Sequence, residues 1–510
     1  MSINFSMILP LIFYFVLIMG IALWSNRSAA KAASAHSFIE EYFIGSRSMG
    51  GFVLAMAIIT TYTSASSFVG GPGVAYKLGL GWILLSMIQV PTAFLTLGVL
   101  GKRFAIISRR TNSVTITDFI RSRYSSEWVV FLSSFFLLIF FMASMLAQFI
   151  GGARLFESVT GFSYQTGLII FGLTVVIYTT IGGFRAVVLT DTIQGVMMLF
   201  ASTAILAAVV SAGGGVENIM RELGSIDPGL LTPEGPSGAI PKPFILSFWV
   251  LVGFGVLGLP QTTQKCMGYR DSKSMHNAMI IGTFAVGFTM LTMHLVGAMG
   301  RAVVPGIEVG DLAVPTITIK LLSPFWAGVF IAGPIAAIMS TVDSMLIMCS
   351  AAIVKDLYFH YVAKNDITRV TPDKIKLFSF IVTSVTGALV FAAAFNPPSL
   401  LVWINLFAFG GLEAVFFCPI LFGLYWKRAN STGAVLSILS GSASFFWFTI
   451  TKTSIMGTTA IVPTIIISTV FFIAGSLQVR KREKKLLKFL IYKRRYFYER
   501  YYSGSCHPVG

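Results

Sequence analysis

Charged residues are scarce in this chain. Asp, Glu, Lys and Arg make up only 11% of its 510 residues, whereas a typical soluble domain carries about 25%. Apolar residues make up 55% of the chain, and the mean hydropathy is +0.81. A water-soluble domain of this length could not bury so much apolar surface, because a large share of any folded surface still faces the solvent. The composition therefore predicts a protein whose solvent is lipid.

Cysteine and histidine are too few and too scattered to build a catalytic or metal centre. The four cysteines form no CxxC pair, and the five histidines do not cluster. We therefore expect no disulfide framework and no zinc site. No nucleophile is paired with a base in the way that covalent catalysis requires. These absences argue against an enzyme.

Long apolar runs fill most of the chain. A helix needs about 20 mostly apolar residues to cross a bilayer, and it satisfies its backbone hydrogen bonds within one segment, as lipid requires. The sequence therefore predicts an all-α membrane protein with about thirteen transmembrane helices. Their expected positions are 7–24, 50–72, 81–100, 128–150, 163–181, 193–213, 243–262, 277–299, 325–353, 377–396, 399–425, 432–451 and 456–476.

Basic residues are unevenly distributed among the segments that connect these spans. The chain has 37 Lys and Arg against 20 Asp and Glu, a net charge of +17. If the N-terminus lies outside, most of the basic residues fall in inward loops, as the positive-inside rule requires. We therefore expect an external N-terminus and a cytoplasmic C-terminus in the cell (inner) membrane. The positive charge is then an orientation signal rather than a nucleic-acid surface.

The second span is unusually polar. Seven of the eight residues from Thr60 to Ser67 carry hydroxyls, and Gly70, Gly71 and Pro72 follow. Hydroxyls at membrane depth are unfavourable unless they meet a partner or a polar cavity. A break in this helix would expose carbonyl oxygens, which suit a hard cation. Packing of the hydroxyls between helices is the alternative.

Two later spans carry related features. In the seventh span Pro260 would free an upstream carbonyl, but taken alone this span favours an ordinary proline kink. In the ninth span Ala337, Ser340 and Thr341 lie at i, i+3 and i+4 and share one helix face. One carbonyl and two hydroxyls from that face, with two carbonyls from the second span, would give five neutral oxygens. Such a set predicts a weak, reversible sodium site.

Two motifs carry a resemblance to a known family. The first is Gly182, Gly183, Phe184, Arg185 and Ala186 in the loop expected after the fifth span, followed by Thr190, Asp191, Gln194 and Gly195. The second is Gly423, Leu424, Tyr425, Trp426, Lys427 and Arg428, followed by Gly433 and Ala434. The chain resembles the sodium:solute symporter family up to about residue 476. The resemblance implies that sodium is the coupling ion for a small organic solute, and proline, a sugar or a short carboxylate are among the solutes it leaves open.

The resemblance also implies the architecture, an inverted repeat of five plus five helices like that of the leucine transporter. The first transmembrane helix and an inner loop would occupy 1–49, and the two repeats 50–213 and 243–426. An outer loop at 214–242 would separate them, and the last two helices would occupy 427–476. A basic tail at 477–510 could lie on anionic lipid, but we favour a dispensable extension. A membrane sensor that reuses the fold is a rival interpretation, although no long signalling domain follows the last helix.

The site residues follow from the same resemblance. The implied sodium ligands are the carbonyls of Thr60, Thr63 and Ala337 and the hydroxyls of Ser340 and Thr341. The implied solute contacts are Ser66, Ser67, Gln89 and Gln261, and Gln148 is a candidate for the solute path. The implied gating or coupling residues are Asp191, Arg185 and Pro260.

Three further polar residues lie within the expected spans. We expect Asp343 to face an inner vestibule as a solvated charge, with contact to the ion as the alternative. For Glu413 we expect a hydrogen bond to freed backbone or to water. For His294 we expect a satisfied buried histidine rather than a proton relay.

Overall fold

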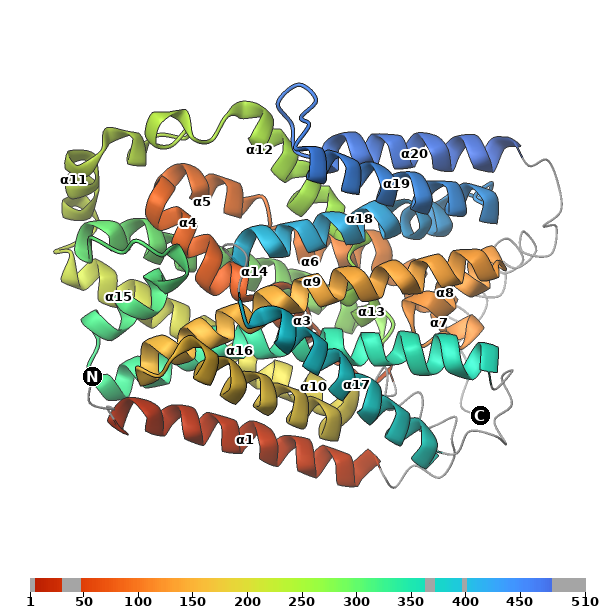
Figure 1. The fold of residues 1–510 in the computed structure, drawn as a ribbon, viewed down its shortest axis with the longest axis horizontal. Coiled ribbons are helices and arrows are strands. Elements are labelled where there is room, and N and C mark those ends of the chain that lie inside the picture. Colours follow the sequence, from red (N-terminus) through yellow and green to blue (C-terminus); the bar gives the residue numbers. More distant parts are fainter. Residues whose placement is uncertain (1–4, 30–46, 363–371, 397–400, 479–510) are drawn as a thin grey trace, which may run out of the picture.

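The chain folds into a bundle of helices in a computed structural model that describes residues 5–29, 47–362, 372–396 and 401–478. These described residues contain no β-strand beyond a single bridge between Met49 and Tyr269. Most of the long helices run roughly along one direction (Figure 1). The all-α prediction is therefore confirmed.

Nine long helices form the frame of the described bundle. They are α1 (Phe5–Ala29), α9 (Glu127–Thr160), α10 (Tyr164–Ala212), α14 (Ser272–Val303), α16 (Pro324–Ser350), α17 (Pro372–Ala394), α18 (Leu401–Tyr425), α19 (Ser431–Thr451) and α20 (Ile461–Gln478). The π-helix η9 (Ala351–Val362) continues α16. Every residue of α16 from Ile331 to Ser350 is buried. Polar groups on this part of α16 must therefore find their partners within the protein.

Short helices make up the remaining segments. The second and third spans consist of α3 (Gly51–Tyr62), η2 (Ser66–Gly70), α4 (Gly71–Leu78), α5 (Leu80–Met87), α6 (Thr92–Phe94), η3 (Leu95–Gly101) and α7 (Lys102–Thr111), and α8 (Ile116–Tyr124) follows. The segment after α10 and the seventh expected span consist of α11 (Val216–Ile226), η4 (Pro228–Leu231), η5 (Pro236–Gly238), α12 (Lys242–Phe248), η6 (Trp249–Phe254), η7 (Gly255–Gly258) and α13 (Pro260–Lys265). After α14 come η8 (Gly310–Leu312) and α15 (Ala313–Leu321).

The described residues contain fewer membrane-crossing helices than the thirteen that the sequence predicts. Eleven helical segments of the described chain are long and apolar enough to cross a membrane, and the bent pair Gly51–Tyr62 and Ser66–Leu78 makes a twelfth. The seventh expected span divides into one helical stretch, Lys242–Gly258 (α12, η6 and η7), and α13, and this apolar stretch is shorter than a spanning helix. Leu259 is extended, because the residue before a proline avoids the helical region. The figure of thirteen spans stays a prediction.

One segment that we expected to be a loop is helical. The residues from Gly182 to Thr192, between the fifth and sixth expected spans, lie inside α10. Residues 164–181 and 186–212 of this helix are each long and apolar enough to cross a membrane. The glycine pair that suggested a loop therefore lies within helical backbone.

The segment between α10 and α12 packs onto the bundle. Gly79 joins α4 to α5 with φ 70°, a conformation that favours glycine. A Cβ at Gly79 would lie 2.1 Å from the carbonyl oxygen of Leu230 in η4, and one at Gly81 would lie 2.4 Å from that of Pro233. The two glycines thus let this segment lie directly against the turn between α4 and α5.

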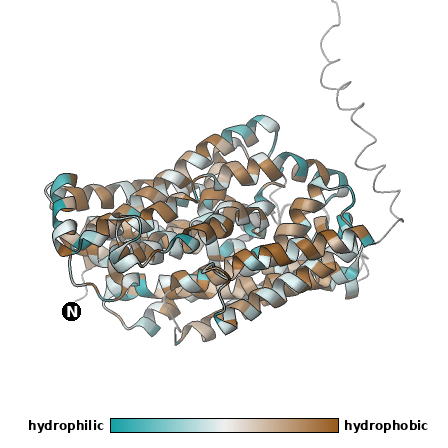
Figure 2. Ribbon diagram, turned by 90° about the horizontal axis from the view of Figure 1, so that it is seen from above, coloured by the Kyte–Doolittle hydropathy of each residue, from teal (hydrophilic) through white to brown (hydrophobic). Residues whose placement is uncertain are grey.

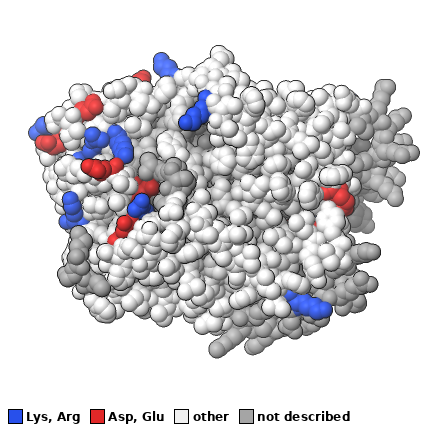
Figure 3. All heavy atoms as spheres, in the orientation of Figure 1, with Lys and Arg blue, Asp and Glu red and all other residues white. Residues whose placement is uncertain are grey.

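Apolar side chains cover much of the outside of the bundle. Large exposed examples are Phe131 on α9, Phe284 on α14 and Ile466 on α20. The long helices carry extended hydrophobic stretches (Figure 2). In Figure 3 charged side chains gather towards one end of the visible face and are sparse across its middle. A soluble monomer rarely exposes large contiguous apolar patches, so this surface suits lipid.

Candidate functional site

The second span breaks at the residues that the sequence singles out. α3 ends at Tyr62, Thr63 is extended with φ −74° and ψ 128°, and helical structure resumes at Ser66. The two halves are bent by 70°. The N–H of Ser64 lies 3.4 Å from the Oγ of Ser67, so it does not close the normal helical bond to Thr60. The break therefore leaves backbone carbonyls available in the middle of a span.

Five oxygens meet across this break. The Ser340 Oγ lies 3.0 Å from the carbonyl oxygens of both Thr60 and Ala337. The Thr341 Oγ1 lies 3.0 Å from the carbonyl oxygen of Thr63, 3.4 Å from that of Thr60 and 2.9 Å from that of Ala337. All five residues are fully buried. The structure thus brings together every residue that the sequence predicts as a sodium ligand.

The chemistry of this oxygen cluster suits a loosely held monovalent cation. Each hydroxyl has one proton and two acceptor lone pairs, so rotation of the two O–H bonds turns both oxygens towards an ion. Hard cations prefer oxygen ligands. None of the five oxygens carries a formal charge, so an ion held here keeps a low barrier to release.

A buried ion pair lies beside the cluster. Lys265, the last residue of α13, donates to the Asp191 carboxylate on α10 over 3.0 Å, and the two side chains are 2% and 0% exposed. The Lys265 Nζ also lies 3.5 Å from the Oγ of Ser344, which is 3.3 Å from the Oγ1 of Thr61. Polar contacts therefore run from α13 through α16 to the residue that follows Thr60.

The structure places the three expected gating residues in different surroundings. Asp191 lies in the ion pair. Pro260 is the first residue of α13, where its ring suits a helix start, so it follows a complete break and does not kink a continuous helix. Arg185 belongs to α10, but its side chain lies outside the described part of the structure.

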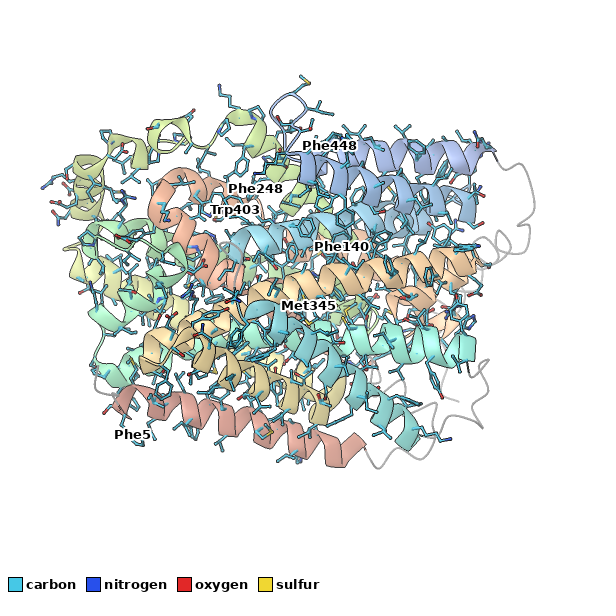
Figure 4. All side chains as sticks on the ribbon, viewed as in Figure 1. Phe5, Phe140, Phe248, Met345, Trp403 and Phe448 are labelled. Carbon is cyan, nitrogen blue, oxygen red and sulfur yellow. The ribbon has the colours of Figure 1, made fainter. Side chains whose placement is uncertain are left out.

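A cavity lies next to the broken segment. Polar residues of its lining come from the break and η2, from α5 and the turn after it, from α14 and from α18, and aromatic side chains also line it. The lining residues include Ser64, Ser66, Ser67, Ser86, Gln89, His294, Asn405, Tyr62, Trp82, Phe248 and Phe409. Trp82 packs edge-on against Phe248 and Trp403 with ring centroids 5.4 Å and 6.1 Å away. Phe248 and Trp403 lie close together in Figure 4.

Three of the four expected solute contacts line this cavity, namely Ser66, Ser67 and Gln89. The fourth, Gln261, does not. It is buried in α13, and neither atom of its side-chain amide has a hydrogen-bond partner within the described residues. The structure thus separates Gln261 from the cavity.

Sequence reasoning missed Asn405 and Lys265 as site residues. Asn405 is a polar residue within an apolar run, and Lys265 is a charge directly after a broken span, so both carried a signal. His294 also lines the cavity. Its Nδ1 lies 2.7 Å from the Met290 carbonyl oxygen, so only one ring nitrogen is satisfied by the helix.

Two intramembrane acids differ from expectation. Asp343 is fully buried and accepts a hydrogen bond from the Tyr178 hydroxyl, so the interpretation as a solvated vestibule charge is wrong for this structure. Glu413 is fully buried, and neither of its carboxyl oxygens has a hydrogen-bond partner within the described chain. The expected bond to freed backbone is therefore not made. A Cβ at Gly255 would lie 2.2 Å from the Glu413 Oε2, so this glycine makes room for the carboxyl group.

The fold and the site together define a multi-pass membrane transporter built around broken helices. The sequence model of the sodium:solute symporter family matches residues 42–441. The chain belongs to the sodium:solute symporter family. Its members are transporters and not enzymes, and sodium is the coupling ion.

Relatives and solved structures agree with this assignment. The chain is 49% identical to the sodium/pantothenate symporter of Haemophilus influenzae, with 95% of this chain and 99% of that protein covered. It is 48% identical to the sodium/pantothenate symporter of Escherichia coli, with 92% and 96% covered. A Na⁺-coupled sialic acid symporter in an outward-open state superposes with a TM-score of 0.77 at 17% identity, covering 93% of this chain and 97% of that one. This last likeness concerns the fold alone.

Proposed function

We propose that this protein imports pantothenate together with sodium across the cytoplasmic (inner) membrane by alternating access. Near-complete coverage at 49% and 48% identity to two sodium/pantothenate symporters supports the choice of solute. Similarity to an osmoregulated proline transporter of Bacillus subtilis is lower, at 30%. Proline, a sugar or a short carboxylate therefore remain the alternatives, and a sensor role has less support.

One observation carries the proposed coupling: the same broken segment contributes to the five-oxygen cluster and lines the cavity. Thr60 and Thr63 supply carbonyl oxygens to the five-oxygen cluster. Ser64, Ser66 and Ser67, which follow at once, line the cavity. Sodium bound at the cluster would fix the geometry of this segment and complete the solute pocket. Coupling then follows, because sodium stabilises the conformation that binds solute well.

The charges of the two solutes constrain the cycle. Pantothenate is a monoanion, so it cancels the charge of one sodium ion. The membrane potential contributes about 2.3 kcal/mol per net charge per 100 mV. A transport cycle driven by the potential would therefore need more than one cation for each pantothenate.

The remaining assignments belong to the same proposal. The N-terminus would lie outside and the C-terminus in the cytoplasm, as the distribution of basic loops favours. The segments 50–213 and 243–426 would form the two inverted repeats, with broken helices in corresponding positions. The ion pair of Asp191 with Lys265, together with the break before Pro260, would act in gating. This view is supported by the contact of Lys265 with Ser344, which in turn contacts Thr61 beside the five-oxygen cluster.

Uptake of labelled pantothenate into proteoliposomes tests the proposal. We expect accumulation under an inward sodium gradient and none when potassium replaces sodium. Unlabelled pantothenate should compete, and proline and glucose should not. Sodium-dependent uptake of a different solute, without pantothenate uptake, would reject the solute assignment. Equal uptake in sodium and potassium would reject the coupling.

A further inference from the structure

The cavity contains no obvious cation for an anionic solute. None of the described residues that line it is Lys or Arg. The positive end of a half-helix is a common alternative for binding an anion. A carboxylate must therefore bind either to the free N–H groups at the start of the second half of the broken span, or to neutral side-chain donors.

The N–H groups at that helix start are already used. The Ala65 N–H donates to the Gln148 Oε1 over 2.7 Å, and the Ser66 N–H donates to the Ser64 Oγ over 3.2 Å. The N–H groups of Ser67 and Phe68 both donate to the Ser64 carbonyl oxygen. The half-helix thus gives its N–H groups to the protein and not to a ligand.

The hydrogen bond from the Ala65 N–H fixes the orientation of the Gln148 amide. Gln148, Ser144 and Asn405 form a buried chain of hydrogen bonds, which we call the relay. A backbone N–H can only donate, so the oxygen of the Gln148 amide must face Ala65. The Gln148 Nε2 then faces the Asn405 Oδ1 at 3.3 Å, and the Ser144 Oγ lies 2.8 Å from the same oxygen. Gln148, Ser144 and Asn405 are at most 2% exposed.

Asn405 is the end of this relay, and its orientation follows. Its Oδ1 is held by Gln148 and Ser144 on the protein side. Its Nδ2 is left as a donor without a hydrogen-bond partner in the described part of the chain, and the residue lines the cavity. Gln89 is arranged in the same way. Its Oε1 accepts from the Tyr62 hydroxyl over 3.0 Å, so its Nε2 is left as a donor towards the cavity that Gln89 lines.

We infer that Asn405 binds the carboxylate of the solute through its Nδ2, with Gln89 as a second neutral donor, and that Gln148 orients Asn405 for this task. Because each amide in the relay accepts through its oxygen and donates through its nitrogen, the N–H of the half-helix start leads to a free N–H donor at the cavity. No charged side chain is needed there. Neutral donors bind a carboxylate well when several converge. The inference rests on the proposed import of pantothenate, since it assigns the group that recognises the anionic end.

Competition by two matched solutes tests the inference. Pantothenate and its alcohol analogue, in which a hydroxymethyl group replaces the carboxylate, compete for uptake of labelled pantothenate into proteoliposomes. Asn405→Asp keeps the shape but replaces the amide donor by an acceptor. A hydrogen bond to a charged group contributes about 1.5–3 kcal/mol, so we expect affinity for pantothenate to fall roughly tenfold to a hundredfold. Affinity for the alcohol should change far less.

Two further variants are measured in the same competition assay: a control for the chemical change and a test of how Asn405 is oriented. Asn218→Asp makes the same chemical change on the exposed helix α11 and should leave both affinities unchanged. Gln148→Glu removes the donor that holds the Asn405 Oδ1, so it should reduce the preference for pantothenate over the alcohol. Sodium-dependent thermal stabilisation of each purified variant reports whether it is folded.

The outcomes separate the two claims. A loss of preference for the carboxylate in Asn405→Asp, in protein still stabilised by sodium, is the expected result. An equal loss for both solutes, or an unchanged preference, overturns the role of Asn405. Failure of the unmodified protein to bind pantothenate at all would instead remove the proposed function, and the inference with it.

Discussion

At the scale of single residues, we propose that the hydroxyls of Ser340 and Thr341 are needed for sodium to drive transport. Replacing both Ser340 and Thr341 by Ala removes two of the five oxygens and leaves the carbonyls of Thr60 and Thr63 without these donors. We expect the sodium concentration for half-maximal uptake to rise at least about tenfold, the equivalent of 1.4 kcal/mol. Sodium titration of uptake measures this change.

Two conservative variants sharpen that measurement. Thr341→Ser keeps a hydroxyl and should stay close to the unmodified protein. Ser442→Ala removes a buried hydroxyl in α19 that bonds only within its own helix, and it should not change the sodium dependence. An unchanged sodium dependence in the double variant would place the ion elsewhere.

Gly71 is a second residue where a small change should have a large effect. A Cβ there would lie 2.4 Å from the His294 Nε2 and 2.7 Å from the Ser66 carbonyl oxygen. Gly71→Ala should therefore displace the cavity wall and raise the KM for solute more than it alters sodium activation. Gly98→Ala is the matched control, because its nearest neighbour is the flexible Met279 side chain at 3.3 Å. Equal kinetics in the two variants would contradict this view of the cavity.

At this scale the sequence grouped the residues of the five-oxygen cluster better than it grouped those that line the cavity. Ala337, Ser340 and Thr341 share a helix face, so local spacing already groups them. Asn405 meets Gln148 only because α18 packs against α9, and no local pattern encodes that contact. Gln261 follows a break as expected, but the orientation of α13 turns it away from the cavity.

At the scale of elements, the broken helices depend on contacts that their own sequences do not contain. Glycine, proline and hydroxyl content suggested a break in the second span, whereas in the seventh span it favoured a kink and only the family resemblance implied a break. The sequence did not reveal that Lys265 from the seventh span would pair with Asp191 inside the protein. Nor did it reveal that the segment from Gly182 to Thr192 would be helical.

The Lys265–Asp191 pair gives a prediction at this scale. Lys265→Met leaves a buried carboxylate unpaired, and removing one member of such a pair is destabilising by about 3–5 kcal/mol. Adding Asp191→Asn should recover most of that loss, because neither charge remains. Thermal unfolding in detergent measures all three proteins. A double variant no more stable than Lys265→Met would show that the pair does not act as a unit.

Transport by the double variant tests the proposed gating role separately. If the ion pair only stabilises the fold, the stable double variant should transport normally. We expect slow uptake with near-normal sodium affinity instead, because the link from α13 to Ser344 is lost.

At the scale of the whole molecule, hydropathy and family resemblance predicted an all-helical fold with many apolar spans, while the count of thirteen and the inverted repeat stay predictions. Long apolar runs locate most spans, because the thickness of the bilayer sets the length of a helix that crosses it and lipid requires its backbone hydrogen bonds to be internal. The seventh span shows the limit, since hydropathy predicts one continuous span although the helix is interrupted at Leu259. The tail beyond residue 478 lies outside the described residues, so its expected role stays a prediction.

Removal of that tail is a direct test. Truncation after Gln478 keeps α20 complete, and we expect uptake per inserted molecule to be unchanged. Surface labelling or fluorescence of a carboxyl-terminal tag normalises the amount of protein in the membrane. Loss of uptake in correctly inserted protein would mean that the basic tail takes part in transport.

The central claim is that pantothenate and sodium cross together through one broken-helix site. The most direct measurement counts labelled sodium and labelled pantothenate entering the same proteoliposomes at a clamped membrane potential. We predict that each solute accelerates entry of the other, in a fixed ratio, and that the Ser340→Ala, Thr341→Ala double variant loses this mutual acceleration. Entry of pantothenate at an undiminished rate without accompanying sodium would contradict the account.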